Sequence, residues 1–494
     1  MMFRYWVLDG KEYRSKRPIV SKVLLLFIVV SISLFFLVKL FNKFGYEFEN
    51  VDHTIIQMIL KGNVPVIAWV YTWETANIPK NLIVKEWRFD TFKILFVEIY
   101  TLDELKVIAE NSWYVGTVSG FVIKPPEIPI EIKIEDVQKA KTRNYAFEIH
   151  NPFLKYTGKG ITIAVLDTGI DYLLPIFYKN CDNSTTRNVK IKALISFIVR
   201  VNNKPIIWRF DWYLKGLNTS LTLLKKWEDD VFLEIGVYPF FDLIGHGTSV
   251  SALINSEPNC YINGFSGIAP NVNLVVIKIF PDNVTTGLDV ILDALHWIYY
   301  HYREYNISVI SMSLNVYAPA WGEFSNPINI VLDALVKKGI AIFIACGNEG
   351  NYPGTLNNVG ISKNVFTVGA WDPIHHKIAS FTSLPTLGQK PIDFLAVGYL
   401  VWTVLPKESM LYITIKKYYP QLIIDDDKGL VLMLGTSYST PIVASIYATW
   451  YEWFIENIRK KPTIGEISYL MCTKGYLTGK IPEIVRCGLI KTPS

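Results

Sequence analysis

From Gly160 onward, short apolar runs alternate with longer stretches in which apolar positions have a helical spacing. The runs are Ile161–Leu166, Leu274–Ile279, Val309–Met312, Ile340–Ala345 and Val365–Val368. Runs with few polar interruptions are typical of strands covered on both faces, and the intervals between them are long enough for the crossover helices of βαβ units. The pattern predicts an α/β domain with a mainly parallel sheet, whose chemistry should lie at strand ends and helix starts.

A different pattern covers residues 45–135. Its segments are the apolar runs Val64–Val70, Ile94–Ile99 and Val115–Val122 and the helix-like Leu102–Ala109. The helix is headed by Thr101-Leu-Asp-Glu, a capping-box pattern, so the region is predicted to form a small α+β module. A stalk domain would show the same pattern. The prolines of Pro125-Pro126-Glu-Ile-Pro129 favour extended backbone and mark a linker to the next domain.

One long apolar stretch near the start is framed by basic residues. Val23–Val38 carries no charge, and the stems of Lys22 and Lys39 extend it toward the length of about 20 residues that a bilayer requires. Residues 1–22 hold six basic residues against two acidic ones, which is most of the net charge of +5. The positive-inside rule then predicts a basic cytoplasmic tail at 1–22 and a transmembrane signal-anchor helix at 23–40.

The protein is therefore expected in the cell membrane as a single-pass protein, with its N-terminus cytoplasmic and everything after residue 40 extracellular. A cleaved signal peptide is the alternative, although Leu40-Phe41-Asn42-Lys43-Phe44 lacks the small residues of a cleavage site. Because the basic charge is concentrated in the tail, it gives no support to a nucleic-acid partner.

Two further features fit an exported chain. Asn-x-Ser/Thr triplets, which a glycosylating host could modify into a glycoprotein, begin at Asn183, Asn218, Asn283 and Asn306. The five cysteines permit bridges between Cys472 and Cys487 and between Cys181 and Cys260, which leaves Cys346 as a small buried residue. Few cysteines, many aromatic residues and abundant Ile and Lys are compatible with a thermophilic archaeal source.

Three short glycine-containing segments carry the residue types of one catalytic machine. Asp167 stands in Val-Leu-Asp-Thr-Gly, His246 in Gly-His-Gly-Thr-Ser, and Ser437 in Gly-Thr-Ser-Tyr-Ser-Thr-Pro. A serine hydroxyl is a poor nucleophile at neutral pH, so it needs an imidazole to take its proton and a carboxylate to orient that imidazole. Ser437 should begin a helix with Pro441 in its first turn, where free backbone N–H groups can face an anion. Taken singly, each residue also has a structural interpretation, as a helix cap or a surface group.

The order Asp, His, Ser, with each residue in its own segment, resembles the subtilisin-like serine peptidases. The resemblance covers residues 140–494 and implies a three-layer subtilisin-like fold. It implies a serine endopeptidase in which Ser437 attacks a peptide carbonyl, His246 shuttles the proton and Asp167 orients His246. It also makes Asn348, in Ala-Cys-Gly-Asn-Glu-Gly, the oxyanion-hole amide, and the module at 45–135 an inhibitory propeptide that the enzyme removes from itself.

The resemblance further implies a pocket for the residue that precedes the scissile bond. Its two walls would be Ser313, Leu314 and Asn315 on one side and Ala345, Cys346 and Gly347 on the other. Asn315 stands where the family usually has glycine, and Cys346 where a second alanine is common. Because side chains at these positions would narrow or polarise the pocket, we expect a narrower cleavage preference than the family's usual one for large apolar residues.

Compared with compact family members, this chain has two insertions, near 175–240 and 399–432. The second contains Asp425-Asp426-Asp427, which is either a structural calcium site or a solvated turn. Zinc-ligand spacings and phosphate-binding glycine loops are missing from the sequence, and the serine mechanism requires no cofactor. The expected partners are protein or peptide substrates, the propeptide-like domain and the membrane. The alternatives are a catalytically silent scaffold that binds surface proteins or polysaccharide, and an esterase or peptide ligase that uses the same residues.

Overall fold

The computed structural model describes most of the chain after residue 49. The described residues are 50–118, 122–124, 132–151, 153, 155–182, 188–201, 204–205, 207–211, 221–261, 265–282, 285–317, 326–357, 359, 362–474 and 485–493. The expected tail at 1–22, the expected membrane helix at 23–40 and the linker prolines lie outside this set, and so do the triplets at Asn183, Asn218 and Asn283. Within the set, no helix is long and apolar enough to cross a membrane.

The described chain divides into two units. The first comprises residues up to Val84 together with Phe96–Thr117, and the second comprises Lys85–Leu95 and everything from Val118 onward. The boundary passes through two strands of one small sheet.

The small sheet has the strand order β2-β3-β1-β4, and β1 pairs antiparallel with β4. The elements of this region are α2 (His53–Leu60), β1 (Val66–Trp73), η1 (Lys80–Leu82), β2 (Ile83–Arg88), β3 (Phe92–Ile99), α3 (Leu102–Glu110) and β4 (Tyr114–Thr117). The expected capping box is present, because the Thr101 side chain accepts from Glu104 N–H and the Glu104 carboxylate accepts from Thr101 N–H. The α+β pattern predicted for this region is therefore observed.

The second unit is built on a nine-stranded sheet of order β10-β7-β11-β6-β12-β14-β15-β16, with β17 also paired to β15. All pairings from β7 to β15, and that of β17, are parallel, and only the edge strands β10 and β16 are antiparallel. The strands are β6 (Thr162–Asp167), β7 (Ile191–Ser196), β10 (Trp208–Asp211), β11 (Asn273–Lys278), β12 (Ile307–Met312), β14 (Ala341–Ala345), β15 (Phe366–Asp372), β16 (Lys377–Ile378) and β17 (Phe394–Val397). The five predicted strands coincide with β6, β11, β12, β14 and β15, which confirms the mainly parallel sheet of an α/β fold.

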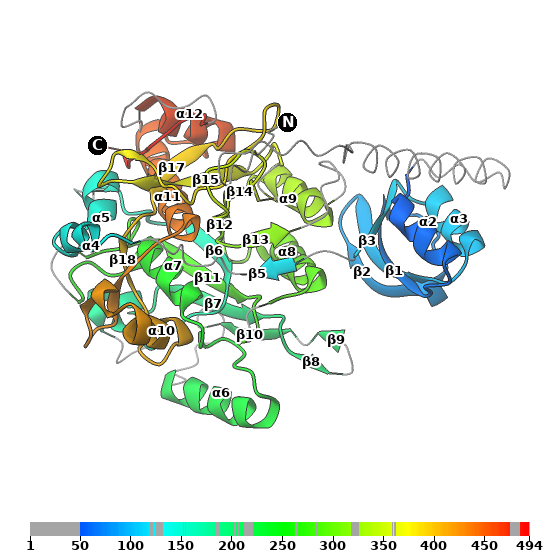
Figure 1. Cartoon of the computed structure of the whole chain (residues 1–494), viewed down its shortest axis with the longest axis horizontal. Coiled ribbons are helices and arrows are strands. Elements are labelled where there is room, and N and C mark those ends of the chain that lie inside the picture. The colour runs from blue at the N-terminus through cyan, green and yellow to red at the C-terminus, as the bar shows by residue number, and fades with distance from the viewer. Residues whose placement is uncertain are drawn as a thin grey trace, which may run out of the picture. The chain divides into compact units, whose positions relative to one another are not determined.

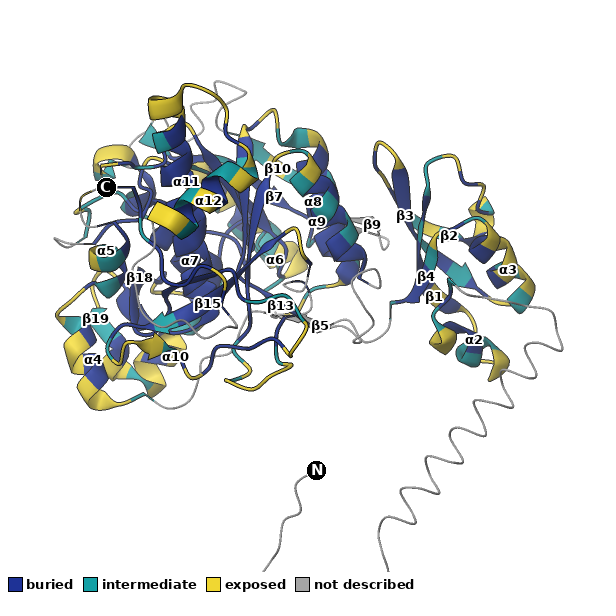
Figure 2. Cartoon of the chain, turned by 90° about the horizontal axis from the view of Figure 1, so that it is seen from above, coloured by how far each residue is buried: buried dark blue, intermediate teal, exposed yellow. Residues whose placement is uncertain are grey.

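Helices cover the two faces of this sheet. α7 (His246–Asn255) packs on β6, and α11 (Thr436–Ile458) packs across β12, β14, β15 and β17 (Figure 1). α8 (Leu288–His301) and α9 (Pro327–Lys337) pack against each other, and α9 also contacts β14. α11 is buried along most of its length, and Figure 2 shows it as a largely dark-blue helix in the interior. The smaller helices of the second unit are α4 (Ile134–Lys141), α5 (Tyr145–His150) and α12 (Ile464–Lys474).

Both expected insertions are folded in their described parts. The first contains η2 (Pro175–Phe177), η3 (Lys179–Cys181), β7, the hairpin strands β8 (Arg200–Val201) and β9 (Lys204–Pro205), β10 and α6 (Leu221–Ile235). The second contains β18 (Val401–Val404), α10 (Met410–Tyr418), η6 (Pro420–Leu422), β19 (Ile423–Asp425) and β20 (Leu430–Met433). Of the strands in the first region, β7 and β10 lie at one edge of the nine-stranded sheet.

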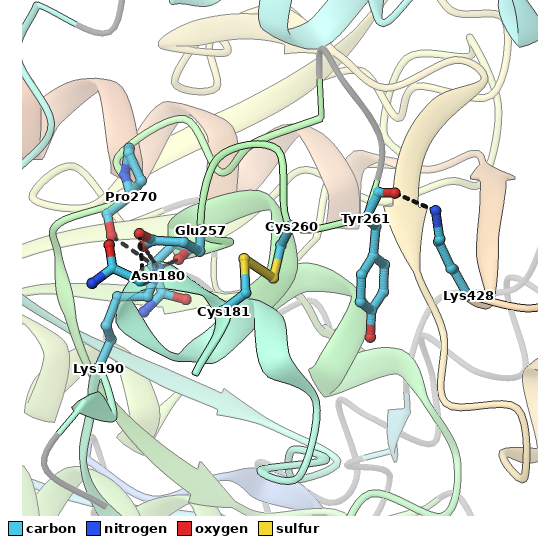
Figure 3. Close-up of a disulfide and its surroundings, with 9 residues drawn as sticks. Asn180, Cys181, Lys190, Glu257, Cys260, Tyr261, Pro270 and Lys428 are labelled. Carbon is cyan, nitrogen blue, oxygen red and sulfur yellow. Dashed lines mark hydrogen bonds and ion pairs between the residues drawn. A yellow bond between two sulfur atoms is a disulfide. The ribbon is translucent and has the colours of Figure 1, made fainter. Parts of the chain in front are cut away.

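Two disulfides join distant parts of the second unit, Cys181 to Cys260 and Cys472 to Cys487, while Cys346 is free and buried. Beside the first bridge, the ammonium of Lys190 is buried and donates to the carbonyls of Asn255 and Pro270 and to the carboxylate of Glu257 (Figure 3). Because Asn255 is the last residue of α7, these contacts hold the far end of the helix that begins with His246.

Candidate active site

Asp167 is the last residue of β6, a strand inside the parallel sheet. Its side chain is fully buried, and Oδ1 accepts from Thr168 N–H over 2.8 Å. The turn that follows requires glycine at 169, because φ is 110° there and a Cβ would lie 2.4 Å from the Phe240 carbonyl oxygen. The strand therefore delivers a buried carboxylate to the carboxyl edge of the sheet.

His246 is the first residue of α7 and points its imidazole at that carboxylate. Nδ1 lies 2.7 Å from Asp167 Oδ1, and the side chain is 4% exposed. Since a carboxylate only accepts, Nδ1 carries a proton and Nε2 of the neutral ring is left as an acceptor. Within the described chain, Nε2 is buried and has no hydrogen-bond partner. The nitrogen that would accept a proton from a nucleophile therefore has no hydrogen-bond partner in the described structure.

Opposing effects set the pKa of His246. Burial disfavours the imidazolium and lowers the pKa, but the charge and hydrogen bond of Asp167, together with the charge of Asp242, outweigh it. The net result is a pKa above the ordinary value of a histidine.

Asp242 is a residue that the sequence analysis missed. Its carboxylate, fully buried, accepts from Thr168 Oγ1 and Gly245 N at 2.8 Å and from Thr248 N and Oγ1 at 2.7 Å. Thr168 Oγ1 in turn accepts from Gly247 N over 2.8 Å. One carboxylate therefore fastens the turn after Asp167 to the start of the helix that carries His246. An acid three residues before the Gly-His-Gly segment was the only available signal.

Ser437 is the second residue of α11, and its side chain is fully buried. Its Oγ donates to the Ser313 carbonyl at 3.4 Å, so the structure does not pair it with His246 Nε2. The neighbouring Tyr438 ring lies against the His246 ring, with 5.9 Å between centroids. Asp167 and His246 are therefore in direct contact, and the residue after Ser437 packs against the His246 ring, while Ser437 Oγ bonds to the Ser313 carbonyl.

The expected position of Pro441 was wrong. It is the sixth residue of α11 and not part of the first turn. A proline there has no N–H to donate to the carbonyl four residues earlier, which belongs to Ser437. That carbonyl instead accepts from Ser313 Oγ over 2.8 Å. The missing helical bond is thus replaced by a contact that ties the serine segment to the chain leaving β12.

Asn348 follows β14 and faces the same segment. Its Oδ1 accepts from Thr436 N at 2.9 Å and from Thr436 Oγ1 at 3.0 Å, while Nδ2 is buried and without a partner among the described residues. A Cβ on Gly435 would lie 3.2 Å from Asn348 Nδ2 and 3.8 Å from Ser437 N. Two N–H groups therefore border one small space beside the serine, and glycine at 435 leaves that space open.

The two predicted pocket walls leave the sheet side by side. Ser313, Leu314 and Asn315 follow β12. Ala345 is the last residue of β14, the parallel neighbour of β12, and Cys346 and Gly347 follow it. Asn315 and Cys346 are both buried. Burial raises the pKa of the Cys346 thiol, so it is held as the neutral thiol and behaves as a small apolar side chain.

Asn357 is a second residue that the sequence did not reveal. Its Nδ2 donates to the Leu314 carbonyl at 2.7 Å and to the Ala345 carbonyl at 3.0 Å, and its Oδ1 accepts from Val316 N at 3.1 Å. One buried amide therefore fixes the separation of the two walls. An isolated asparagine in a loop carries no motif, so only the fold could identify it.

A short strand lies along the first wall. β5 (Val122–Lys124) pairs antiparallel with β13 (Asn315–Tyr317), with Lys124 opposite Asn315 and Val122 opposite Tyr317. A segment of this chain that precedes the sheet domain is thus held by backbone pairing next to Ser313. This is the way in which an extended peptide adds to an exposed strand edge.

The three aspartates at 425–427 do not converge. Asp426 accepts from Lys416 and Tyr412, and Asp425 Oδ1 accepts from the N–H groups of the following turn. Across the described ranges, no group of three His, Cys, Asp or Glu side chains is arranged as a metal ion could use.

A buried carboxylate–imidazole pair beside a serine at a helix start is the arrangement by which serine hydrolases are recognised. The chain belongs to the subtilase family, whose family model matches residues 158–460.

Three curated relatives illustrate the similarity. Serine protease AprX of Bacillus subtilis (strain 168) is 27% identical over 324 residues, 63% of this chain and 61% of that protein. Subtilisin NAT of Bacillus subtilis subsp. natto is 24% identical over 254 residues, 51% of this chain and 50% of that protein. The cuticle-degrading serine protease of Arthrobotrys oligospora is 28% identical over 240 residues, 48% of each.

The chain thus spans between about half and three fifths of the length of these curated relatives. Among solved structures, an S41 psychrophilic protease matches 70% of this chain and 97% of its own, at 20% identity and a TM-score of 0.48.

Proposed function

We propose that this protein is a serine endopeptidase in which Ser437 attacks the carbonyl carbon of a peptide bond. The observation that carries the proposal is the buried 2.7 Å contact between Asp167 and His246, which leaves Nε2 unoccupied next to the serine helix. His246 takes the Ser437 proton and later donates it to the leaving amine, and Asp167 keeps the ring oriented and stabilises its charged form.

Asn348 Nδ2 and the Ser437 backbone N–H would donate to the oxyanion of the tetrahedral intermediate. Both border the space left open at Gly435, and Nδ2 has no other partner in the described structure. Donors that are already in place stabilise the developing charge without reorganisation. For attack to begin, Ser437 Oγ would exchange its contact with the Ser313 carbonyl for a hydrogen bond to His246 Nε2.

The substrate would bind as an extended strand against β13, between the walls at 313–315 and 345–347. The pairing of β5 with β13 supports this mode, because it places a segment of the chain in that position. The same contact supports self-processing. Lys124 lies opposite Asn315, and Asn315 is two residues after Ser313. We therefore propose that the cut falls between residues 124 and 132. The α+β domain before it would act as the propeptide.

The uncharged stretch at 23–38 and the basic tail before it support an anchored enzyme that acts outside the cell. The proposed cut would separate the catalytic domain from that anchor covalently, so the mature enzyme would stay at the membrane only while the propeptide domain remains bound. No metal or cofactor takes part in the proposed chemistry.

The test uses the full chain in detergent, as wild type and as Ser437→Ala. Intact mass, N-terminal sequencing and labelling with a serine-directed fluorophosphonate are compared. We expect wild type to be cut between residues 124 and 132 and labelled at Ser437, and the variant to be neither. Wild type that stays full-length and unlabelled across temperature and pH would refute the proposal and favour the silent binding scaffold. Hydrolysis of esters without hydrolysis of peptides would favour the esterase.

A further inference from the structure

Helix α6 belongs to the first insertion, but one of its residues reaches the interior. The face of α6 that is buried carries Leu221, Leu224 and Glu228. This spacing is that of an apolar helix stripe, and a carboxylate in such a position loses its hydration. Accordingly, burial raises the pKa of Glu228, although three hydrogen bonds to its carboxylate counteract the shift. A charged residue in this place needs a structural reason.

The hydrogen bonds of Glu228 supply that reason. Its Oε1 accepts from Phe240 N at 2.5 Å and from Phe241 N at 2.9 Å, and its Oε2 accepts from the Tyr172 hydroxyl at 2.6 Å. Trp227, its neighbour on α6, also packs against the Phe240 ring, with 6.3 Å between centroids. The carboxylate therefore fixes two successive peptide N–H groups of the segment that ends in Asp242.

The segment Phe240–Asp242 contacts the turn that follows Asp167 and the start of the helix that carries His246. The Phe240 carbonyl accepts from Ile170 N at 3.2 Å and packs against Gly169, in the turn after Asp167. Asp242 holds Gly245 and Thr248, on either side of His246. From the opposite side, the buried ammonium of Lys278 donates to the Phe241 carbonyl at 2.7 Å.

We propose that Glu228 is a positioning residue for the proposed catalytic pair, acting through Phe240–Asp242 on the turn of Asp167 and the start of α7. The inserted helix is then part of the catalytic apparatus and not an appendage to it. Side-chain placement within about 1 Å governs rates in such sites, and a mutation remote from the chemistry that shifts it can cost about 10²-fold. This inference rests on the proposed function, because it assigns Glu228 to the activity of Ser437.

The experiment compares Glu228→Ala, Glu228→Asp and Glu228→Gln in the full chain. Gln retains an oxygen that accepts from both N–H groups, Asp withdraws the carboxylate by one methylene, and Ala removes it. The matched control is Glu234→Ala, on the same helix but exposed. The readouts are the fluorophosphonate labelling rate as a function of pH, the kcat and KM for a peptide substrate, and the melting temperature.

We expect Ala and Asp to slow labelling and kcat by about 10-fold to 10²-fold with little change in KM. The acid-side midpoint should move to lower pH, because a looser Asp167 contact raises the pKa of His246 less. Gln and the Glu234 control should keep the wild-type rate and midpoint. If Ala fails to fold, Asp and Gln still provide the comparison.

Two outcomes would overturn the inference. In the first, Ala and Asp lower the melting temperature but keep the wild-type rate and midpoint when assayed well below it, so Glu228 is only structural. In the second, Gln is as impaired as Ala, so the effect comes from charge and not from placement. Either result leaves the proposed function intact, whereas unlabelled wild type would refute the proposed function itself.

Discussion

Gly435 gives the sharpest test of the proposed oxyanion site. Replacing it by alanine puts a methyl carbon 3.2 Å from Asn348 Nδ2 and 3.8 Å from Ser437 N, which is where the oxyanion would lie. The donors would remain, but the space between them would be filled. Blocking them should cost about as much as losing one donor, 10²–10³-fold in kcat or roughly 3–4 kcal/mol, a magnitude known from subtilisin, a member of this family.

The substitution also strains the backbone, so stability has to be separated from catalysis. The φ of Gly435 is 138°, where a side chain costs on the order of 1–3 kcal/mol. Gly339→Ala is the matched control, because its φ is 87° and no atom lies within 4 Å of the added carbon. Both variants should melt at lower temperature, and only Gly435→Ala should lose kcat.

The assay is peptide hydrolysis well below the melting temperature of both variants, with fluorophosphonate labelling to count competent serines. KM should change little, because the oxyanion forms after substrate binding. A Gly435→Ala enzyme with kcat equal to that of the Gly339→Ala control would refute the placement of the oxyanion beside residue 435.

Three further predictions concern pH and specificity. Activity should be lost as pH falls through the raised pKa of His246, so the acid-side midpoint of the kcat/KM profile should lie above pH ~6.5. Asp167→Asn should move that midpoint to lower pH, and an unchanged midpoint in the variant would contradict the reasoning. Burial, aided by the charges of Glu408 and Asp242, raises the pKa of Asp171 to about 7. Between pH ~4 and 7 the folded state therefore keeps a proton on Asp171 that the unfolded state releases. The free energy of unfolding then falls as pH rises through that window. Asp171→Asn should remove the fall and stabilise the protein above pH 7 by up to about 4 kcal/mol, measured by urea unfolding at several pH values, and an unchanged pH slope would refute it. Asn315→Gly should broaden the cleavage preference in a peptide library, whereas identical profiles for wild type and variant would count against a role of that side chain in the pocket.

The centre of the sheet could be predicted from the sequence because its strands are covered on both faces. Ile163–Leu166 and Ile342–Ala345 are entirely apolar, and such runs in an α/β pattern have few other interpretations. The edges could not be predicted in the same way. β7 is interrupted by Lys192, and β16 has only two residues, so neither pattern stands out from that of a loop.

The residues of the candidate site also differ in how well the sequence reveals them. Asp167, His246 and Ser437 could be found from the sequence because each lies in a short glycine-containing motif and because their proposed chemistry requires these residue types. Asn357 binds backbone groups of two segments that precede it in the sequence, and any sequence could supply those groups. Asp242 binds the nearby N–H groups of Gly245 and Thr248 and the distant Thr168 hydroxyl, and no motif marks this combination. Such residues become visible only when the fold shows which peptide groups they reach.

The position of α11 has a consequence for the order in which the molecule becomes active. The proposed acid–base pair lies on β6 and α7, in the first part of the sheet domain, whereas the proposed nucleophile is carried by a helix that follows all nine strands of the sheet. A chain emerging from the ribosome therefore holds an aspartate and a histidine long before it holds Ser437. Until α11 has been synthesised and has packed into the interior, the nascent protein lacks the proposed nucleophile, so the proposed self-cleavage has to wait for the last part of the domain.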